Sequence, residues 1–266
     1  MKLKRSTIRR AAAGLLAACL SGWASAASET AVADSPPTEL RLGFTRSWAM
    51  PWGEVVGEEV RAGIHRDIGE ALARRLGLPL VWARVPQQRE IAPHSAEHMR
   101  RHADLGCGMH PSWFPNAAHH QWSPPLFDIG DQLVGRQGQA APATVKSLPS
   151  GTRVGTVRGY HYPMLQPLFD SGQLRRDDAP DQAAALRKLV RGHTAVAVVS
   201  QQSLHWFQRQ HPDARLADWR LPVQAAQYHC AIPKGSPLQP EPVWQALEAM
   251  KREGELARIL ARYAPG

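Results

Sequence analysis

The residues best suited to chemistry lie together in one stretch of the chain, Ala103 to Phe127, with the sequence ADLGCGMHPSWFPNAAHHQWSPPLF. This stretch holds a cysteine, two tryptophans, three histidines and four prolines within 25 residues. Thiolate and imidazole groups bind zinc or form a nucleophile–base pair, whereas tryptophan rings line ligand-binding loops. Composition alone therefore leaves three kinds of site open: a metal site, a catalytic or redox cysteine, and a binding loop.

A metal site requires three or four ligands that converge from fixed positions. Cys107 and His110 form a Cys-x-x-His pair, but the candidate for a second pair, His229–Cys230, lacks that spacing. We interpret the His119–His120 pair as a solvated turn. We therefore expect no metal, no other cofactor and no catalytic residue.

The first 26 residues predict export from the cytoplasm. Residues 1–10 carry five basic residues and no acid, residues 11–23 are mostly apolar, and residues 24–26 offer the small-x-small pattern of a cleavage site. This segment is too short to span a membrane. We expect a secretory signal peptide that is removed after Ala26, which places the mature chain in the periplasm.

Two other export routes stay open. Residues 16–19 also resemble a lipoprotein signal, which would keep Cys19 as a lipidated N-terminus and tether the chain to a membrane. The pair Arg9–Arg10 is compatible with twin-arginine export. We expect contact with a membrane only in the lipidated case.

Export leaves two cysteines, Cys107 and Cys230, in an oxidising compartment. A pair of cysteines there favours a disulfide over two free thiols. A catalytic Cys–His pair would require Cys107 to stay reduced, against the redox state of the compartment.

The charge of the mature chain excludes one class of partner. The whole chain has 32 Lys and Arg, and removal of the five in the signal leaves 27 against 23 Asp and Glu. The basic residues are scattered and form no stripe of the kind that a phosphate backbone requires. We therefore expect no nucleic-acid binding.

The elements that must position these residues alternate between strand and helix. Apolar spacing and turn residues predict strands at 40–45, 78–85, 103–109, 152–157, 194–200 and 227–233. They predict helices at 63–77, 91–102, 159–172, 181–192 and 202–210, and two closing helical segments around Gly254. This alternation indicates an α/β protein with parallel strands joined by helical crossovers.

Seven segments in this order resemble the periplasmic type II solute-binding proteins, specifically the bacterial extracellular solute-binding family 3 of the polar amino acid uptake type. The segments are LRLGFT, the Pro51–Trp52 pair, GIHRDIGEALARRLGL, ADLGCGM with WSPPLF, LPSGTRVGTVRGYHY, YHCAIPKGSP and ALEAMKREGELARILARY. The resemblance implies a two-lobed fold in which each lobe is a mixed, mostly parallel sheet flanked by helices, and two crossing strands join the lobes.

The resemblance also implies where the lobes begin and end. The expected parts are the signal peptide 1–26, a flexible lead-in 27–38, a discontinuous first lobe 39–133 plus 228–266, and a second lobe 134–227, with crossings near 132–138 and 224–231. In this layout the third strand lies beside the return strand, so the resemblance implies a Cys107–Cys230 disulfide.

The chain departs from the family at both charged ligand clamps. Amino-acid-binding members grip the ligand carboxylate with an arginine shortly after the third strand, where this chain has Asn116 and no arginine from Leu105 to Gly135. They hold the ammonium group with an aspartate after the apolar strand of the second lobe, where this chain has Ser200. A zwitterion would lose both partners in a closed cleft, which is expensive. We therefore do not expect a standard amino acid as the ligand.

Other residues suit the cleft by type and position. Tryptophan and tyrosine rings can stack on an aromatic ligand or hold a cation. Residues 159–161 are expected to begin a helix whose free N–H groups bind an oxygen, with charge from Arg158. The expected ligand-binding residues are Trp48, Trp52, Arg89, His110, Trp113, Asn116, Arg158, Tyr160, His161 and Ser200.

The sequence thus predicts a non-enzymatic, monomeric periplasmic protein that captures a small polar or aromatic solute: an amino-acid-like molecule, an amine or a small carboxylate. The resemblance implies delivery to an ABC transporter permease or a sensor. One alternative is a cleft enzyme like the cyclohexadienyl dehydratases, for which Glu54 and Glu90 are the available acids. Another is a module that no longer binds a small molecule and serves only in an interaction.

Overall fold

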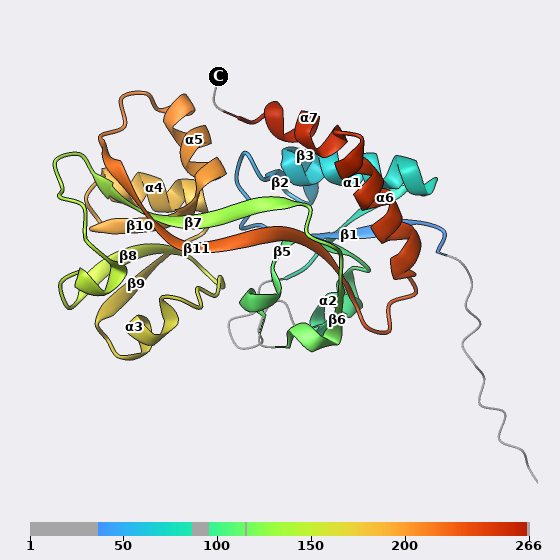
Figure 1. Ribbon diagram of the computed structural model, residues 1–266, viewed down its shortest axis with the longest axis horizontal. Coiled ribbons are helices and arrows are strands. Elements are labelled where there is room, and N and C mark those ends of the chain that lie inside the picture. The colour runs from blue at the N-terminus through green and yellow to red at the C-terminus, as the bar shows by residue number, and fades with distance from the viewer. Residues whose placement is uncertain (1–36, 87–95, 115, 265–266) are drawn as a thin grey trace, which may run out of the picture. The chain divides into compact units, whose positions relative to one another are not determined.

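The computed structural model describes residues 37–86, 96–114 and 116–264 (Figure 1). The expected signal peptide, nearly all of the lead-in and Arg89 lie outside the described residues. Within these ranges, no helix has both the length and the apolar character needed to cross a membrane.

The first lobe, as we use the term, is built on β1, β4, β5 and β6. β1 (Leu40–Phe44) pairs in parallel with β4 (Leu80–Arg84) and touches β5 (Gly106–Met109) through a parallel bridge between Leu42 and Leu105. β6 is the short strand His120–Trp122. A hairpin of β2 (Glu54–Val56) and β3 (Glu59–Ala62) follows β1 and was not predicted.

The second lobe is built on β8, β9 and β10. β8 (Thr152–Val157) pairs in parallel with both β9 (Leu174–Ala179) and β10 (Val196–Ser200). The apolar sequence of β10 predicts a strand covered on both faces. The structure agrees, because Val196 and Val198 join one buried cluster while Ala197 and Val199 join another.

Two long antiparallel strands connect the lobes. β7 (Phe127–Arg136) and β11 (Leu216–Pro233) run side by side through the centre of Figure 1 and pair from the Leu216–Arg136 register to the Tyr228–Phe127 register. β11 also pairs with β5 and β6 of the first lobe, and β7 pairs with β10 of the second. The predicted crossing strands are therefore real, although the predicted lobe boundaries at 133 and 228 stay predictions.

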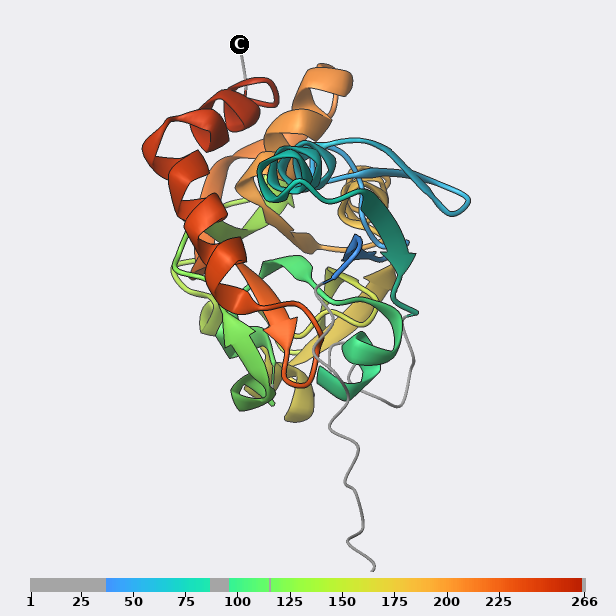
Figure 2. The ribbon, with the colours of Figure 1, turned by 90° about the vertical axis from the view of Figure 1, so that its right-hand side faces the viewer.

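Helices cover these strands. In the first lobe, α1 (Ile64–Leu76) packs against α6 (Pro240–Arg252) and α7 (Glu255–Ala261), which Figure 2 shows in red beside it. The predicted 3.6-residue spacing is borne out, since Ile64, Ile68 and Leu72 are all buried, and Gly77 ends the helix with φ 66°. The remaining helices are α2 (Ala96–His102), α3 (Gln166–Asp170), α4 (Gln182–Val190) and α5 (Gln201–Gln210).

One predicted helix is wrong over half of its length. Residues 159–165 form turns and irregular chain, and helix α3 begins only at Gln166. Pro163 disfavours the helical conformation at Tyr162, which explains the late start. The guanidinium of Arg176 donates to the backbone carbonyl of Tyr160 at 3.0 Å and holds this segment in its irregular course.

Candidate ligand-binding site

A pocket lies between the two lobes where β7 and β11 pass from one to the other. Its volume is about 140 Å³. A water-sized position takes about 10–15 Å³, so the pocket has room for a ligand of roughly ten non-hydrogen atoms. Residues of both lobes line it, including Trp48, Trp52, Trp113 and Met109 from the first and Tyr160, His161 and Ser200 from the second.

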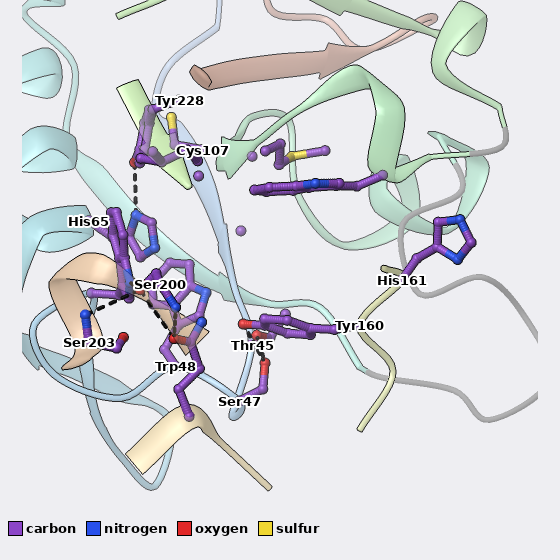
Figure 3. Close-up of a pocket in the computed structure, with 18 of the residues that line it drawn as sticks. Thr45, Ser47, Trp48, His65, Cys107, Tyr160, His161, Ser200, Ser203 and Tyr228 are labelled. Atoms are coloured by element: carbon purple, nitrogen blue, oxygen red, sulfur yellow. Dashed lines mark hydrogen bonds between the residues drawn. The ribbon is translucent and has the colours of Figure 1, made fainter. Parts of the chain in front are cut away.

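The first-lobe wall is a stack of aromatic rings. The centroid of the His65 ring lies 4.1 Å from that of the Trp48 ring and 5.3 Å from that of the Trp52 ring. The Trp52 and Tyr228 rings are stacked, with their centroids 6.2 Å apart. His65 Nδ1 and the Tyr228 hydroxyl share a hydrogen bond of 2.8 Å, drawn as a dashed line in Figure 3. This stack gives the pocket a wall of π-faces.

His65 and Tyr228 are both uncharged in this environment. Burial lowers the pKa of His65 to about 3 and raises the pKa of Tyr228. Gly108 allows the close approach of this histidine, because a Cβ at Gly108 would lie 2.3 Å from His65 Cε1. His65 was not among the expected ligand-binding residues.

Among the described residues that line the pocket, two hydrogen bonds cross from one lobe to the other. Trp52 Nε1 donates to Ser200 Oγ at 2.9 Å, and Ser47 Oγ donates to the Tyr160 hydroxyl at 3.5 Å (Figure 3). Ser200 Oγ also donates to Gln182 Oε1 at 3.1 Å and accepts from the backbone N–H of Ser203, which caps α5. The Ser200 hydroxyl thus lines the pocket but already has three protein partners.

Asp131 on β7 is the one acidic residue among the described residues that line the pocket. Its side chain is partly buried, and desolvation raises the pKa of the carboxyl to about 6. The carboxyl has no hydrogen bond or ion pair to any described residue, and no lysine or arginine of the described chain lines the pocket. Sequence reasoning missed Asp131, and the composition of β7 did not single it out, because this strand also contains Asp128, Gln132 and Arg136.

The structure brings six of the ten expected ligand-binding residues into the pocket lining: Trp48, Trp52, Trp113, Tyr160, His161 and Ser200. Three others lie outside that lining, namely His110, Asn116 and Arg158, and Arg89 lies outside the described residues. Asn116 and Arg158 are exposed to solvent, and His110 Nδ1 bonds to Ser112 Oγ at 2.8 Å. The helix start expected at residues 159–161 is absent, so its N–H donors are not arranged as predicted.

Cys107 and Cys230 form a disulfide, as the resemblance implied. The bond joins the paired strands β5 and β11 of the first lobe, and Cys107 also lines the pocket. Cys107 therefore carries no thiolate for a metal or for catalysis. The expected solvated turn at His119–His120 is wrong for His120, which is 4% exposed and packs against Phe114 and Trp122.

Comparison with known proteins defines the fold but not the family. No family model matches the chain, and no curated protein matches it. Among solved structures, an ancestral arginine-binding protein bound to arginine is 20% identical, with a TM-score of 0.69 over 86% of this chain and 99% of that one. The arginine-, lysine-, histidine-binding protein ArtJ from Geobacillus stearothermophilus is 16% identical, with a TM-score of 0.66 over 85% and 94%.

A third similar structure is an ancestral amino acid-binding protein described as a precursor of cyclohexadienyl dehydratase. It is 18% identical, with a TM-score of 0.64 over 85% of this chain and 95% of that one. The chain thus has the two-lobed α/β fold of the periplasmic binding proteins, as predicted. These neighbours are described as amino-acid-binding proteins, which confirms the predicted resemblance at the level of the fold.

Proposed function

We propose that this protein is a non-enzymatic solute-binding protein that captures one small molecule between its lobes. The observation that carries the proposal is the pocket itself, which is lined by both lobes and crossed at its edge by the Trp52–Ser200 hydrogen bond. Aromatic walls with a few polar groups are typical of small-molecule sites. The pocket volume of about 140 Å³ suits a molecule the size of an amino acid or a small amine.

The basic, apolar leader supports a periplasmic location for this activity, either on a free chain or on one tethered through Cys19. A captured solute would pass to an ABC transporter permease or a membrane sensor. The structural similarity to amino-acid-binding proteins supports this role.

A thermal-shift screen of small metabolites against the mature chain tests the function. A ligand at 100 times its Kd should stabilise the protein by about 2.7 kcal/mol and raise the Tm. Tryptophan fluorescence should then report saturable binding, because Trp48, Trp52 and Trp113 line the pocket. A screen without any ligand would favour the interaction-only alternative.

The second candidate is an elimination enzyme of the dehydratase kind. It is favoured by Asp131, because an acid with a pKa raised to about 6 is suited to proton transfer near neutral pH. The similarity to the dehydratase precursor supports it as well. Such an enzyme must also hold an anionic substrate, and no lysine or arginine of the described chain lines the pocket. Turnover of prephenate or arogenate by the purified protein would establish this candidate in place of the first.

A further inference from the structure

We propose that the ligand of this pocket is a small organic cation that lacks a carboxylate, with Asp131 as its counter-ion and the surrounding aromatic rings as its wall. The inference rests on the proposed solute-binding function. It assigns a chemical class to the ligand from the charges and rings of the described lining.

Asp131 is positioned by strands of both lobes. In the antiparallel pairing of β7 with β10, its Cα partner is Ser200, and in the pairing of β7 with β11 it is Gln224. Paired residues in neighbouring strands point to the same face of a sheet, so these three side chains form a row. The Ser200 hydroxyl is used within the protein, and the Gln224 amide donates to Ser112 Oγ at 2.9 Å. Asp131 is thus the member of the row that is left for a ligand.

The carboxylate of Asp131 has no hydrogen-bond or ion-pair partner among the described residues, although its side chain keeps some contact with solvent. A charged group in such a desolvated position is destabilising until it is paired. A bound cation would supply the missing partner. An anion would instead be repelled, because the lining that the structure describes contains Asp131 and no lysine or arginine.

The rings around the pocket suit the same ligand class. Trp48, Trp52, Trp113 and Tyr160 all line the pocket, and the Tyr160 hydroxyl feels the field of the Asp131 carboxylate. Aromatic faces attract cations, most strongly where water is excluded. A carboxylate in the pocket lining with π-faces in the same lining is the arrangement that suits an ammonium, quaternary ammonium or guanidinium group.

The described lining holds four other titratable side chains, those of His65, Tyr160, His161 and Tyr228. His65 is kept uncharged by its burial, and Tyr160 and Tyr228 have raised pKa values. His161 is the remaining imidazole, and it lies on the second-lobe side of the pocket near Tyr160 in Figure 3.

A matched set of probes tests the proposal. One phenyl skeleton supplies four charge types: phenethylamine as the cation, 2-phenylethanol as the neutral molecule, 3-phenylpropanoate as the anion and phenylalanine as the zwitterion. Choline and its neutral isostere 3,3-dimethylbutan-1-ol form an aliphatic pair. Calorimetry and tryptophan fluorescence measure binding of each probe to the wild type, to Asp131→Asn and to Asp128→Asn. Asp128 lies on the same strand three residues away and is exposed, so Asp128→Asn removes the same charge outside the pocket.

The cations should bind at least about tenfold more tightly than their neutral or anionic counterparts, and Asp131→Asn should remove that preference. Asp128→Asn should keep it. On the wild type, choline affinity should rise about tenfold from pH 5 to pH 7.5 as Asp131 ionises, while the neutral isostere should bind equally at both pH values. The same pH comparison on His161→Gln separates Asp131 from the imidazole that shares the pocket, and it stands even if Asp131→Asn does not fold.

Tighter binding of phenylalanine or 3-phenylpropanoate than of phenethylamine would overturn the cation assignment while supporting solute capture. Cation binding that is unchanged in Asp131→Asn would also overturn it. If no probe of any charge binds, and none is found in the broader metabolite screen, the proposed function itself is refuted together with this inference.

Discussion

The unpaired carboxylate of Asp131 makes a quantitative prediction about the stability of the ligand-free protein. Asp131→Asn replaces a carboxyl by an amide of the same shape that cannot ionise. A pKa of about 6, against the ordinary value of 3.8, corresponds to about 3 kcal/mol at 1.36 kcal/mol per pKa unit. Because the group keeps some contact with water at the pocket wall, we expect about 1–3 kcal/mol.

The sign of the effect follows from proton binding. Below pH 3.8 the carboxyl is protonated in both the folded and the unfolded chain, so it does not affect the free energy of unfolding. Between that pH and about 6 the folded protein holds the proton more tightly, and above pH 6 it carries the unpaired charge. The folded wild type therefore loses stability as pH rises through this window, whereas Asp131→Asn does not.

Urea unfolding, followed by tryptophan fluorescence between pH 4 and pH 8, measures the difference. Both proteins should first be stripped of ligand by unfolding and refolding, since a bound ligand would add its own stabilisation. Asp131→Asn should be equal to the wild type near pH 4 and about 1–3 kcal/mol more stable at pH 8. The buried His65 titrates in both proteins and cancels in the difference. A stability difference that does not depend on pH, or a less stable variant at pH 8, would refute the reasoning.

Three further changes test the positioning of the pocket. Trp52→Phe keeps an aromatic ring but removes the indole hydrogen bond to Ser200 of the second lobe. It should destabilise the arrangement in which the lobes are joined at the pocket by about 1 kcal/mol, measured as weaker ligand binding. Replacing Cys107 and Cys230 by alanine should lower the free energy of unfolding by about 2–4 kcal/mol in urea titrations, because the disulfide closes a long loop. Gly108→Ala should destabilise the protein by about 2 kcal/mol or more in the same assay, since φ is +76° there and the new Cβ would meet the His65 ring at 2.3 Å.

Matched controls distinguish these effects from general damage. Trp122→Phe removes an indole hydrogen bond of the same length, donated to the backbone carbonyl of Ala117 within the first lobe. It should leave ligand affinity unchanged. Gly57→Ala also places a side chain at positive φ, +64°, but with no atom within 4 Å, so a cost equal to that of Gly108→Ala would contradict the steric explanation. Alkylation of Cys107 or Cys230 in the unfolded, unreduced protein would show that the disulfide is not formed.

The parts of the fold that sequence reasoning obtained are those encoded by local patterns. Helix α1 follows from the spacing of Ile64, Ile68 and Leu72, and strand β10 from an unbroken apolar run. Of the parts that it missed, the β2–β3 hairpin is local, whereas strand β9 depends on partners far away in the chain. Strand β9, with the sequence LRRDDA, has no apolar alternation. Ion pairs with neighbouring elements stabilise it, including Asp177 with Arg153 and Lys188.

The difference between local sequence patterns and long-range contacts also explains which residues of the candidate site were predicted. Aromatic type and loop position were enough to select Trp48, Trp52 and Trp113, because large rings after a strand are unusual on a surface. Arg158 was selected for its charge, and it faces solvent because the expected helix start does not form beside it. Asp131 was missed because the first crossing strand was expected to begin near residue 132, just after it, whereas β7 begins at Phe127.

The absence of the arginine and the aspartate that hold the ligand in amino-acid-binding members, and the presence of Asp131, have one physical explanation. Without an arginine near Asn116, a ligand carboxylate has no described partner in the pocket, and a carboxylate would also lie in the field of Asp131. Position 200 on β10 holds a serine instead of an acid, but the adjacent strand β7 has an acid beside it, because Asp131 is the Cα partner of Ser200. Under the proposed assignment, Asp131 is the partner for the positive end of a ligand, and the described lining offers no lysine or arginine for a negative end. A chain with these two changes should discriminate against amino acids and in favour of amines derived from them, and that preference follows from electrostatics whatever the rest of the ligand is.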